Sequence, residues 1–178
     1  SAKPYTARRS SHGCATVMTF QPVVVGSGIA GWKFLQQTYE PQFATFSKSS
    51  QLSRDIDYFS ETIGTIETAE SLVKDRRLLS VALGAFGLQD DVDNRYFIQK
   101  ILEDGTVNDD ALANKLADSR YADFSEAFGF GNFSGAGRTG LSFFADEIID
   151  RYEAKQFEQA VGEQNNDMRL ALNLGPAL

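Results

Sequence analysis

Cysteine and histidine are nearly absent from this chain, which holds only Cys14 and His12. A single cysteine excludes an internal disulfide and a zinc ribbon, and it fits a reducing compartment. Both residues lie within residues 1–17, so the rest of the chain has no histidine for a metal cluster or for a serine–histidine–aspartate triad. These absences favour a protein that is not an enzyme, and they predict neither a metal nor a cofactor.

Proline and long apolar runs are also scarce. Only four prolines occur, and three of them lie within the first 41 residues, so the middle of the chain is free of helix breakers. No apolar run approaches the roughly 18–20 residues that span a bilayer. The sequence therefore predicts no membrane insertion.

Basic residues are outnumbered by acidic ones, 17 to 24, which gives a formal charge of −7. Residues 1–17 hold three of the cations and no acid, so the rest of the chain carries a charge of −10. A surface of that sign repels phosphate backbones and anionic membranes, which argues against nucleic acid as a partner. The same change in composition divides the chain into an upstream extension or leader, residues 1–17, and a helical domain, residues 18–178.

Gly26, Gly28 and Gly31 match the G-x-G-x-x-G spacing of a dinucleotide-binding turn, and they follow three valines. That fold also needs a second strand that ends in an acid about 20 residues further on. The sequence after Gly31 has no β-branched run that fits such a strand. We therefore interpret the glycines as a turn that lets a helix starting near Ile29 pack closely.

A second glycine-rich segment, residues 131–140, nearly matches a phosphate-binding loop. Asn132 stands where that loop has its first glycine, Arg138 stands where it has lysine, and no strand precedes it. Two interpretations stay open, of which the first is favoured. The segment is a plain loop between helices, or it forms an anion-binding nest of backbone N–H groups. The residues of that nest would be Gly135, Gly137, Arg138 and Thr139.

Apolar residues recur at three- and four-residue intervals along residues 18–178, and no segment alternates with a period of two for long enough to be a strand. The predicted class is all-α: a single domain of about six to eight helices with a long C-terminal helix. We expect the first helix to end, and another to start, at residues 38–41, because proline suits a first turn. The longest pattern runs from Thr139 towards Leu174, with an irregularity at Gly162.

Capping residues mark the ends of the helices that lie between residue 41 and the long C-terminal pattern. Gly87 and Gly105 are expected to end helices. The expected N-caps are Ser50, Thr68, Asp91, Asn108 and Asp118.

A weak internal repeat relates residues 73–88 to residues 116–130. Each copy has an Asp-x-Arg motif, at Asp75 and at Asp118, and each ends in Ala-Phe-Gly. We expect each aspartate to cap a helix, each arginine to reach a neighbouring carboxylate or carbonyl, and each Ala-Phe-Gly to pack a ring and end the helix. A duplicated helical hairpin would explain the repeat.

Several long segments resemble one bacterial family, the domain of unknown function twelve-seventeen. They include SGIAGWKFLQQT, SLVKDRRLLSVALGAFGL, ALANKLADSRYADFSEAFGFG and FEQAVGEQNNDMRLALN, and the resemblance covers about residues 18–173. It implies an α-helical domain from a bacterium. It also implies a role in flagellar assembly or motility, because genes of this family often lie among flagellar genes in alphaproteobacteria. No catalytic residues are defined for the family.

Three functions remain in competition. The first is a non-enzymatic interaction protein linked to the flagellum, either cytoplasmic or exported. Its protein partner, such as a flagellar component, would bind the apolar side chains of Met168, Leu170, Leu172 and Leu174, although packing within the chain is the favoured role for these four. The second is a small-molecule-binding protein or an enzyme that uses acidic residues and the loop 131–140. The third is an oligomeric structural component, and the sequence leaves the oligomeric state open.

Overall fold

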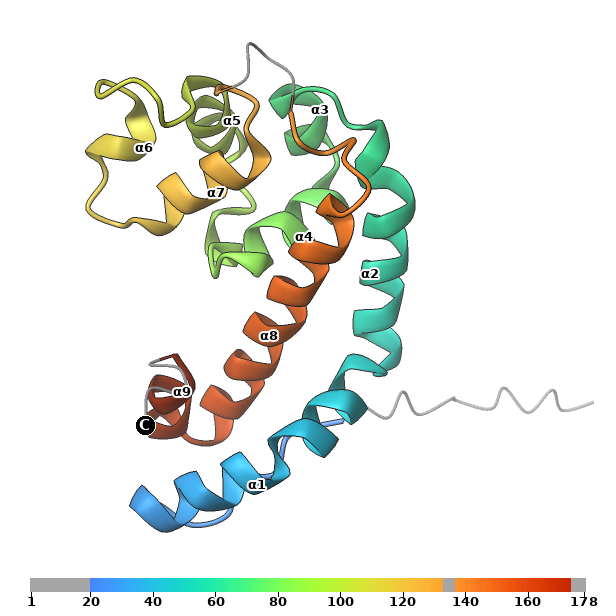
Figure 1. The fold of residues 1–178 in the computed structure, drawn as a ribbon, viewed down its shortest axis with the longest axis vertical. Coiled ribbons are helices and arrows are strands. Elements are labelled where there is room, and N and C mark those ends of the chain that lie inside the picture. Colours follow the sequence, from blue (N-terminus) through green and yellow to red (C-terminus); the bar gives the residue numbers. More distant parts are fainter. Residues whose placement is uncertain (1–19, 133–136, 174–178) are drawn as a thin grey trace, which may run out of the picture.

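A computed structural model describes residues 20–132 and 137–173, and over these residues it is all-helical, which confirms the predicted class (Figure 1). The α-helices are α1 (Gly28–Ser47), α2 (Ser50–Thr62), α3 (Ala69–Lys74), α4 (Arg76–Ala85), α5 (Arg95–Asp104), α6 (Leu112–Lys115), α7 (Arg120–Phe128), α8 (Phe144–Gln164) and α9 (Asn166–Asn173). Two 3-10 turns, η1 (Ile63–Thr65) and η2 (Gln89–Asp91), connect them.

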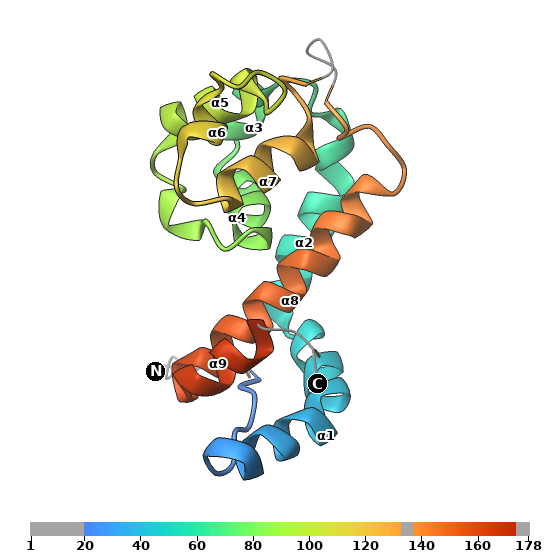
Figure 2. The ribbon, with the colours of Figure 1, turned by 60° about the vertical axis from the view of Figure 1, so that its left-hand side comes forward.

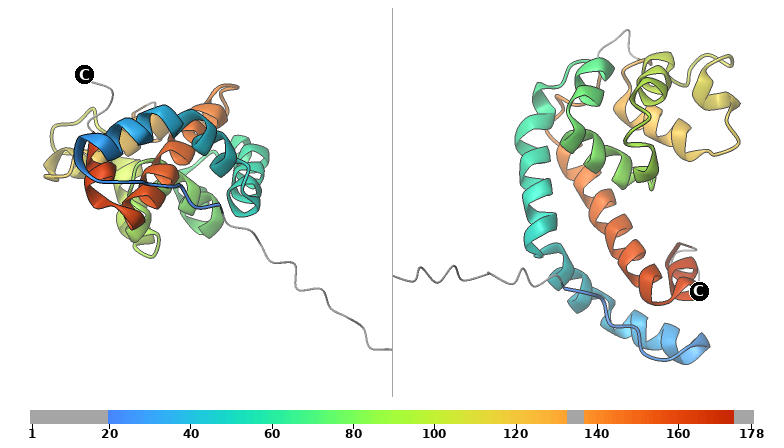
Figure 3. Two further views of the ribbon diagram at one scale, coloured as in Figure 1. Left: turned by 90° about the horizontal axis from the view of Figure 1, so that it is seen from below. Right: turned by 180° about the vertical axis from the view of Figure 1, so that it is seen from behind.

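The helices form two groups that α2 and α8 join (Figure 2). Helices α3 to α7 surround one hydrophobic core together with α2 and the first half of α8. Helices α1 and α9 lie at the opposite end, where they pack on the last turns of α8 (Figure 3). Leu35, Phe157, Val161 and Met168 form a second, smaller core there. The long helix α8 therefore contributes to both cores.

The internal repeat has part of the local structure that we expected: Asp75 is the N-cap of α4, whereas the N-cap of α7 is Ser119 rather than Asp118. Asp75 Oδ1 accepts the backbone N–H groups of Arg77 and Leu78, both at 3.0 Å, and so caps α4. Asp118 Oδ1 accepts the N–H of Arg120 at 3.0 Å at the start of α7. The Arg120 guanidinium donates to the carbonyl of Gly87, where the first copy ends. The second copy thus binds directly to the end of the first.

Both copies also end as predicted. Gly87 and Gly129 have φ of 70° and 71°, the left-handed conformation that ends a helix at little cost for glycine. The preceding rings, Phe86 and Phe128, are buried in the first core. Phe124 lies between them, with centroids 5.5 Å from Phe86 and 5.0 Å from Phe128.

Asp75 allows a test of this capping by pH. Burial raises the pKa of its carboxyl, but hydrogen bonds from the Tyr58 hydroxyl and from the Leu78 and Arg77 amides outweigh burial and leave the pKa below its ordinary value of 3.8. The stabilisation is therefore present above the unfolded-state pKa and is lost as the pH falls through the folded-state pKa. We expect Asp75→Ala to lower the free energy of unfolding at pH 7 by about 1–2 kcal/mol.

Urea denaturation at pH 7 and at pH 3 measures this effect. The difference between wild type and Asp75→Ala should be smaller at pH 3, because part of the stabilisation is already lost once the pH falls below the unfolded-state pKa. Asp109→Asn, in an exposed loop, is the control and should change little at either pH. A difference that is equally large at both pH values would show that the charge of Asp75 contributes nothing to the cap.

The expected break at residues 38–41 is wrong, because α1 continues through Pro41 to Ser47. Proline removes one backbone hydrogen bond of the helix, but aromatic packing on both sides of it holds the helix together. Tyr39, Phe43 and Phe46 all contact the ring of Phe157, with centroids 5.2, 5.5 and 5.5 Å away. A break at Pro41 would separate Tyr39 from the other two rings and from their shared partner.

The C-terminal pattern also differs from expectation. It begins at Phe144 rather than Thr139, and it is divided at Asn165 rather than at Gly162, which stays inside α8. Asn165 has extended backbone, and its Oδ1 accepts the N–H of Asp167 at 3.0 Å. A single residue thus separates α8 from α9 and caps α9. The structure describes nine α-helices, more than the six to eight expected, because this pattern and the one over residues 69–87 each divide into two.

Among the remaining caps, Thr68 accepts the N–H of Ser71 as expected, and Gly105 follows the last residue of α5. Ser50 is the first residue of α2, and Asn108 lies in the turn before α6. The expected cap at Asp91 is wrong. This residue lies in η2, where its carboxylate accepts the hydroxyl of Tyr121 at 2.6 Å, and α5 begins only at Arg95.

Candidate functional site

The first glycine pattern builds a close contact between α1 and α9. Gly26 and Gly28 have φ of 83° and 59° and turn the chain into α1. A Cβ atom at Gly31 would lie 2.8 Å from Met168 Cε and 2.9 Å from the carbonyl oxygen of Gly26. Gly31 therefore lets α9 approach α1, as the interpretation of a closely packed turn predicted.

In the described part of the second glycine-rich segment, Arg138 and Thr139 bind groups of the protein itself. The Arg138 N–H donates to the carbonyl of Phe128 at 2.8 Å, and its guanidinium lies 3.6 Å from Glu147. Thr139 is buried, and its hydroxyl donates to the carbonyl of Ile66. Gly137 packs against the ring of Phe130. Gly135 lies outside the described residues, so the structure places three of the four residues of the predicted anion nest.

The predicted partner-binding residues of the C-terminus are divided between core and surface. Met168 is buried in the second core, and Leu172 is partly buried beside it. Leu170 is 49% exposed. Leu174 lies outside the described residues. In this arrangement α9 packs on its own chain, and of the described residues among these four, Leu170 and part of Leu172 are exposed.

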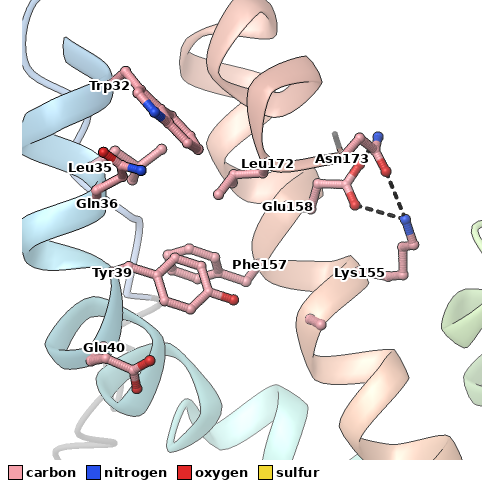
Figure 4. Close-up of a pocket in the computed structure, with 11 residues that line it drawn as sticks. Trp32, Leu35, Gln36, Tyr39, Glu40, Lys155, Phe157, Glu158, Leu172 and Asn173 are labelled. Atoms are coloured by element: carbon pink, nitrogen blue, oxygen red, sulfur yellow. Dashed lines mark hydrogen bonds and ion pairs between the residues drawn. The ribbon is translucent and has the colours of Figure 1, made fainter. Parts of the chain in front are cut away.

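A groove of about 660 Å³ lies between α1 on one side and α8 and α9 on the other (Figure 4). Trp32, Tyr39 and Leu172 are partly exposed in it, and the fully buried side chains of Leu35 and Phe157 lie behind them. Polar and small residues complete the lining: Gln36, Glu40, Ala154, Lys155, Glu158 and Asn173. The groove thus combines an aromatic floor with charged side chains at its edge.

Several side chains of the groove are held in place by their neighbours. Lys155 Nζ donates to Glu158 Oε2 at 2.8 Å and to Asn173 Oδ1 at 3.0 Å, which connects α8 to α9 (Figure 4). Burial, and then the nearby charges of Glu40 and Glu158, raise the pKa of the Tyr39 hydroxyl. Tyr39 therefore stays neutral at physiological pH and offers a hydroxyl group beside an apolar surface.

Sequence reasoning found one residue of this groove, Leu172, and missed the others. One signal was available, because Trp32, Leu35 and Tyr39 follow one another at three- and four-residue intervals and so share a face of the predicted helix. Periodicity cannot show whether another element covers that face. Here α8 and α9 cover Leu35 fully and leave Trp32 and Tyr39 partly exposed.

The described residues hold no group of three acidic, histidine or cysteine side chains arranged to bind a metal ion. None of the described helices is long and apolar enough to cross a membrane.

Comparison with known proteins places the chain in a family. A family model described as "Protein of unknown function (DUF1217)" matches residues 85–175, just over half of the chain. The chain belongs to the DUF1217 family. The resemblance found in the sequence is thereby confirmed. A search of curated proteins gave no match.

A crystal structure of a protein from Agrobacterium tumefaciens is similar to this DUF1217 protein. The TM-score is 0.75 and the sequence identity is 30%, over 86% of this chain and 67% of the other. The DUF1217 match over residues 85–175 includes the wall of the groove formed by α8 and α9. The wall formed by α1 precedes the matched residues.

Proposed function

We propose that this DUF1217 protein is a non-enzymatic interaction protein that binds an apolar segment of a partner protein in the groove between α1, α8 and α9. The observation that carries this proposal is the combination of an aromatic floor and a charged edge in a groove of about 660 Å³. Aromatic residues are enriched at protein interfaces, and an amphipathic helix lying in an apolar groove is a recurrent mode of recognition.

An exposed apolar side chain lies on α1 one turn before the residues that line the groove. Ile29 is 78% exposed and lies one helical turn before Trp32 on α1. The stripe of Ile29, Trp32 and Tyr39 therefore offers apolar surface over three turns of α1. A bound helix would cover this stripe and fill the space above Phe157.

The resemblance to the family adds a class of partner. Its genes often lie among flagellar genes, so the proposed partner is a component of the flagellar basal body, hook or export apparatus. Within that proposal, the protein acts in the cytoplasm or is exported to the flagellum.

The experiment uses a substitution that fills the groove without removing any packing. Ala154 is exposed and lines the groove, so Ala154→Arg places a long charged side chain inside it. Ala44→Arg, at an exposed position of α1 outside the groove, is the matched control. Both substitutions keep a good helix former in a helix, so both variants should fold, which circular dichroism checks.

We expect wild type and Ala44→Arg to retain the same flagellar proteins from an extract of motile alphaproteobacterial cells, and Ala154→Arg to lose at least nine-tenths of them. Mass spectrometry identifies and quantifies what is retained. Equal retention by all three chains would contradict binding in the groove. If the proteins that Ala154→Arg fails to retain have no flagellar role, the result would support binding in the groove and contradict the link to the flagellum.

Fluorescence then tests where the partner binds. Trp32 is the single tryptophan of the chain and lines the groove, so the intrinsic tryptophan emission responds to a ligand that binds there. A peptide taken from a retained protein and lacking tryptophan should shift the emission of wild type and of Ala44→Arg to shorter wavelength. A peptide that binds without changing the emission binds outside the groove.

A small apolar molecule is a second candidate occupant, because pockets for such ligands span about 300–1,000 Å³. Native mass spectrometry of the purified chain distinguishes this function from the first. An added mass present on wild type and absent from Ala154→Arg would favour a small-molecule-binding protein.

A further inference from the structure

A second, polar pocket of about 170 Å³ adjoins the groove. The two pockets share Lys155, Glu158 and Asn173, so a ligand in the groove would lie next to the polar pocket. The other lining residues come from the turn after α4, from η2, and from α7, α8 and α9: Phe86, Gly87, Gln89, Arg120, Gln159 and Arg169.

The lining of this pocket is cationic in a protein that is acidic overall. It contains the side chains of Arg120, Lys155 and Arg169 but only one carboxylate, that of Glu158. Arg120 is already occupied, because it pairs with Asp118 and donates to the carbonyl of Gly87. Lys155 pairs with Glu158. Arg169, the third cation, has no such ion pair among the described residues.

Among the residues that the structure describes, the Arg169 side chain has a single acceptor. Its Nε donates to Asn166 Oδ1 at 3.1 Å, and within residues 20–132 and 137–173 its two terminal nitrogens have no acceptor. The aliphatic part of the side chain crosses Gly162 so closely that a Cβ atom there would lie 2.5 Å from Arg169 Cδ. These two contacts orient the guanidinium at the pocket before any ligand arrives, which reduces the entropy lost on binding.

We propose that the segment that fills the groove also places an acidic side chain in this polar pocket, where the carboxylate binds Arg169. The inference rests on the proposed function, because it specifies the chemistry of the same partner. A guanidinium with both terminal nitrogens free matches the two oxygens of a carboxylate. The occupant is thus an apolar segment with an aspartate or glutamate beside it.

Selection of peptides from a random library displayed on phage tests the composition directly. The whole chain is the target, and binders that also bind Ala154→Arg are removed so that only groove binders remain. We expect the remaining peptides to combine apolar residues with aspartate or glutamate at a fixed spacing. Selection on Arg169→Glu should replace those acids by lysine or arginine, because the variant reverses the charge that the peptide meets.

Affinity measurements on one selected peptide give the size of the effect. Arg169→Gln should weaken binding about tenfold, the loss expected for a charge-assisted hydrogen bond worth about 1.4 kcal/mol. Arg169→Lys, which keeps the charge but loses the planar fork, should weaken binding by a smaller factor. Arg95→Gln changes the net charge equally at an exposed position away from both pockets and should leave the affinity unchanged.

The outcomes separate this inference from the proposed function. Groove-specific peptides without acidic residues, or an affinity that Arg169→Gln leaves unchanged, would overturn the inference and leave the groove as a binding site. A selection that yields no groove-specific peptide would contradict both.

Discussion

Phe128→Ala is expected to lower the free energy of unfolding by about 3–5 kcal/mol, the range for removing a buried phenylalanine side chain. Phe128 is fully buried, and its ring lies at the centre of an aromatic cluster. The centroids of Phe124, Phe144 and Phe130 are 5.0, 5.1 and 6.1 Å away. The substitution removes the contacts of Phe128 with all three rings and leaves a cavity that the fixed helices α7 and α8 cannot close.

Urea denaturation followed by circular dichroism measures this loss, and the emission of Trp32 reports on the second core in the same experiment. Because α8 contributes to both cores, the two signals should shift together. Phe143→Ala is the matched control, since Phe143 is 52% exposed, and it should cost less than about 1 kcal/mol. An equal loss for the two variants would show that burial of Phe128 is not what stabilises the first core.

Gly131→Ala is expected to lower the free energy of unfolding by about 3 kcal/mol, the upper end of the usual range for adding atoms to a well-packed site. A Cβ atom at Gly131 would lie 2.3 Å from the backbone nitrogen of Gly105 and 2.5 Å from the carbonyl oxygen of Glu103. These are backbone atoms, so they cannot move aside as a flexible side chain would. The two segments are also joined by Asn132, whose Oδ1 accepts the N–H of Thr106 at 2.7 Å.

Thermal unfolding of Gly131→Ala should show a clearly lowered midpoint. Gly140→Ala is the control, because a Cβ atom there would meet no atom of the described residues within 4 Å. Gly140→Ala should change the free energy of unfolding by no more than about 0.5 kcal/mol. A stable Gly131→Ala variant would mean that the segments at Gly105 and Gly131 can separate without loss of the fold.

The aromatic cluster around Phe128 and the close contact between Gly105 and Gly131 belong to the end of the molecule where α8 begins (Figure 1). The groove lies at the other end of α8. Variants at Phe128 and Gly131 therefore test the stability of the scaffold, whereas Ala154→Arg and Arg169→Gln test binding. A loss of partner binding in the last two, with unfolding midpoints close to wild type, would assign that loss to the groove and the polar pocket.

The sequence by itself determined the features that depend on a few neighbouring residues. The all-α class follows from periodicity, because a helix places residues three and four positions apart on one face. The cap at Asp75 and the ends at Gly87 and Gly129 are local as well, since one side chain or one backbone angle decides each of them. The same is true of the glycine turn at Gly26 and Gly28, whose positive φ angles suit glycine.

Tertiary structure decided what local preference left open or opposed. Pro41 favours a helix break, but the packing of Tyr39, Phe43 and Phe46 around Phe157, more than 100 residues further on, keeps α1 continuous. The groove arises in the same way, because its two walls come from residues 32–40 and 154–173. No local pattern records which helix faces meet, so the groove and the polar pocket that Arg169 lines beside it exist only in the folded chain.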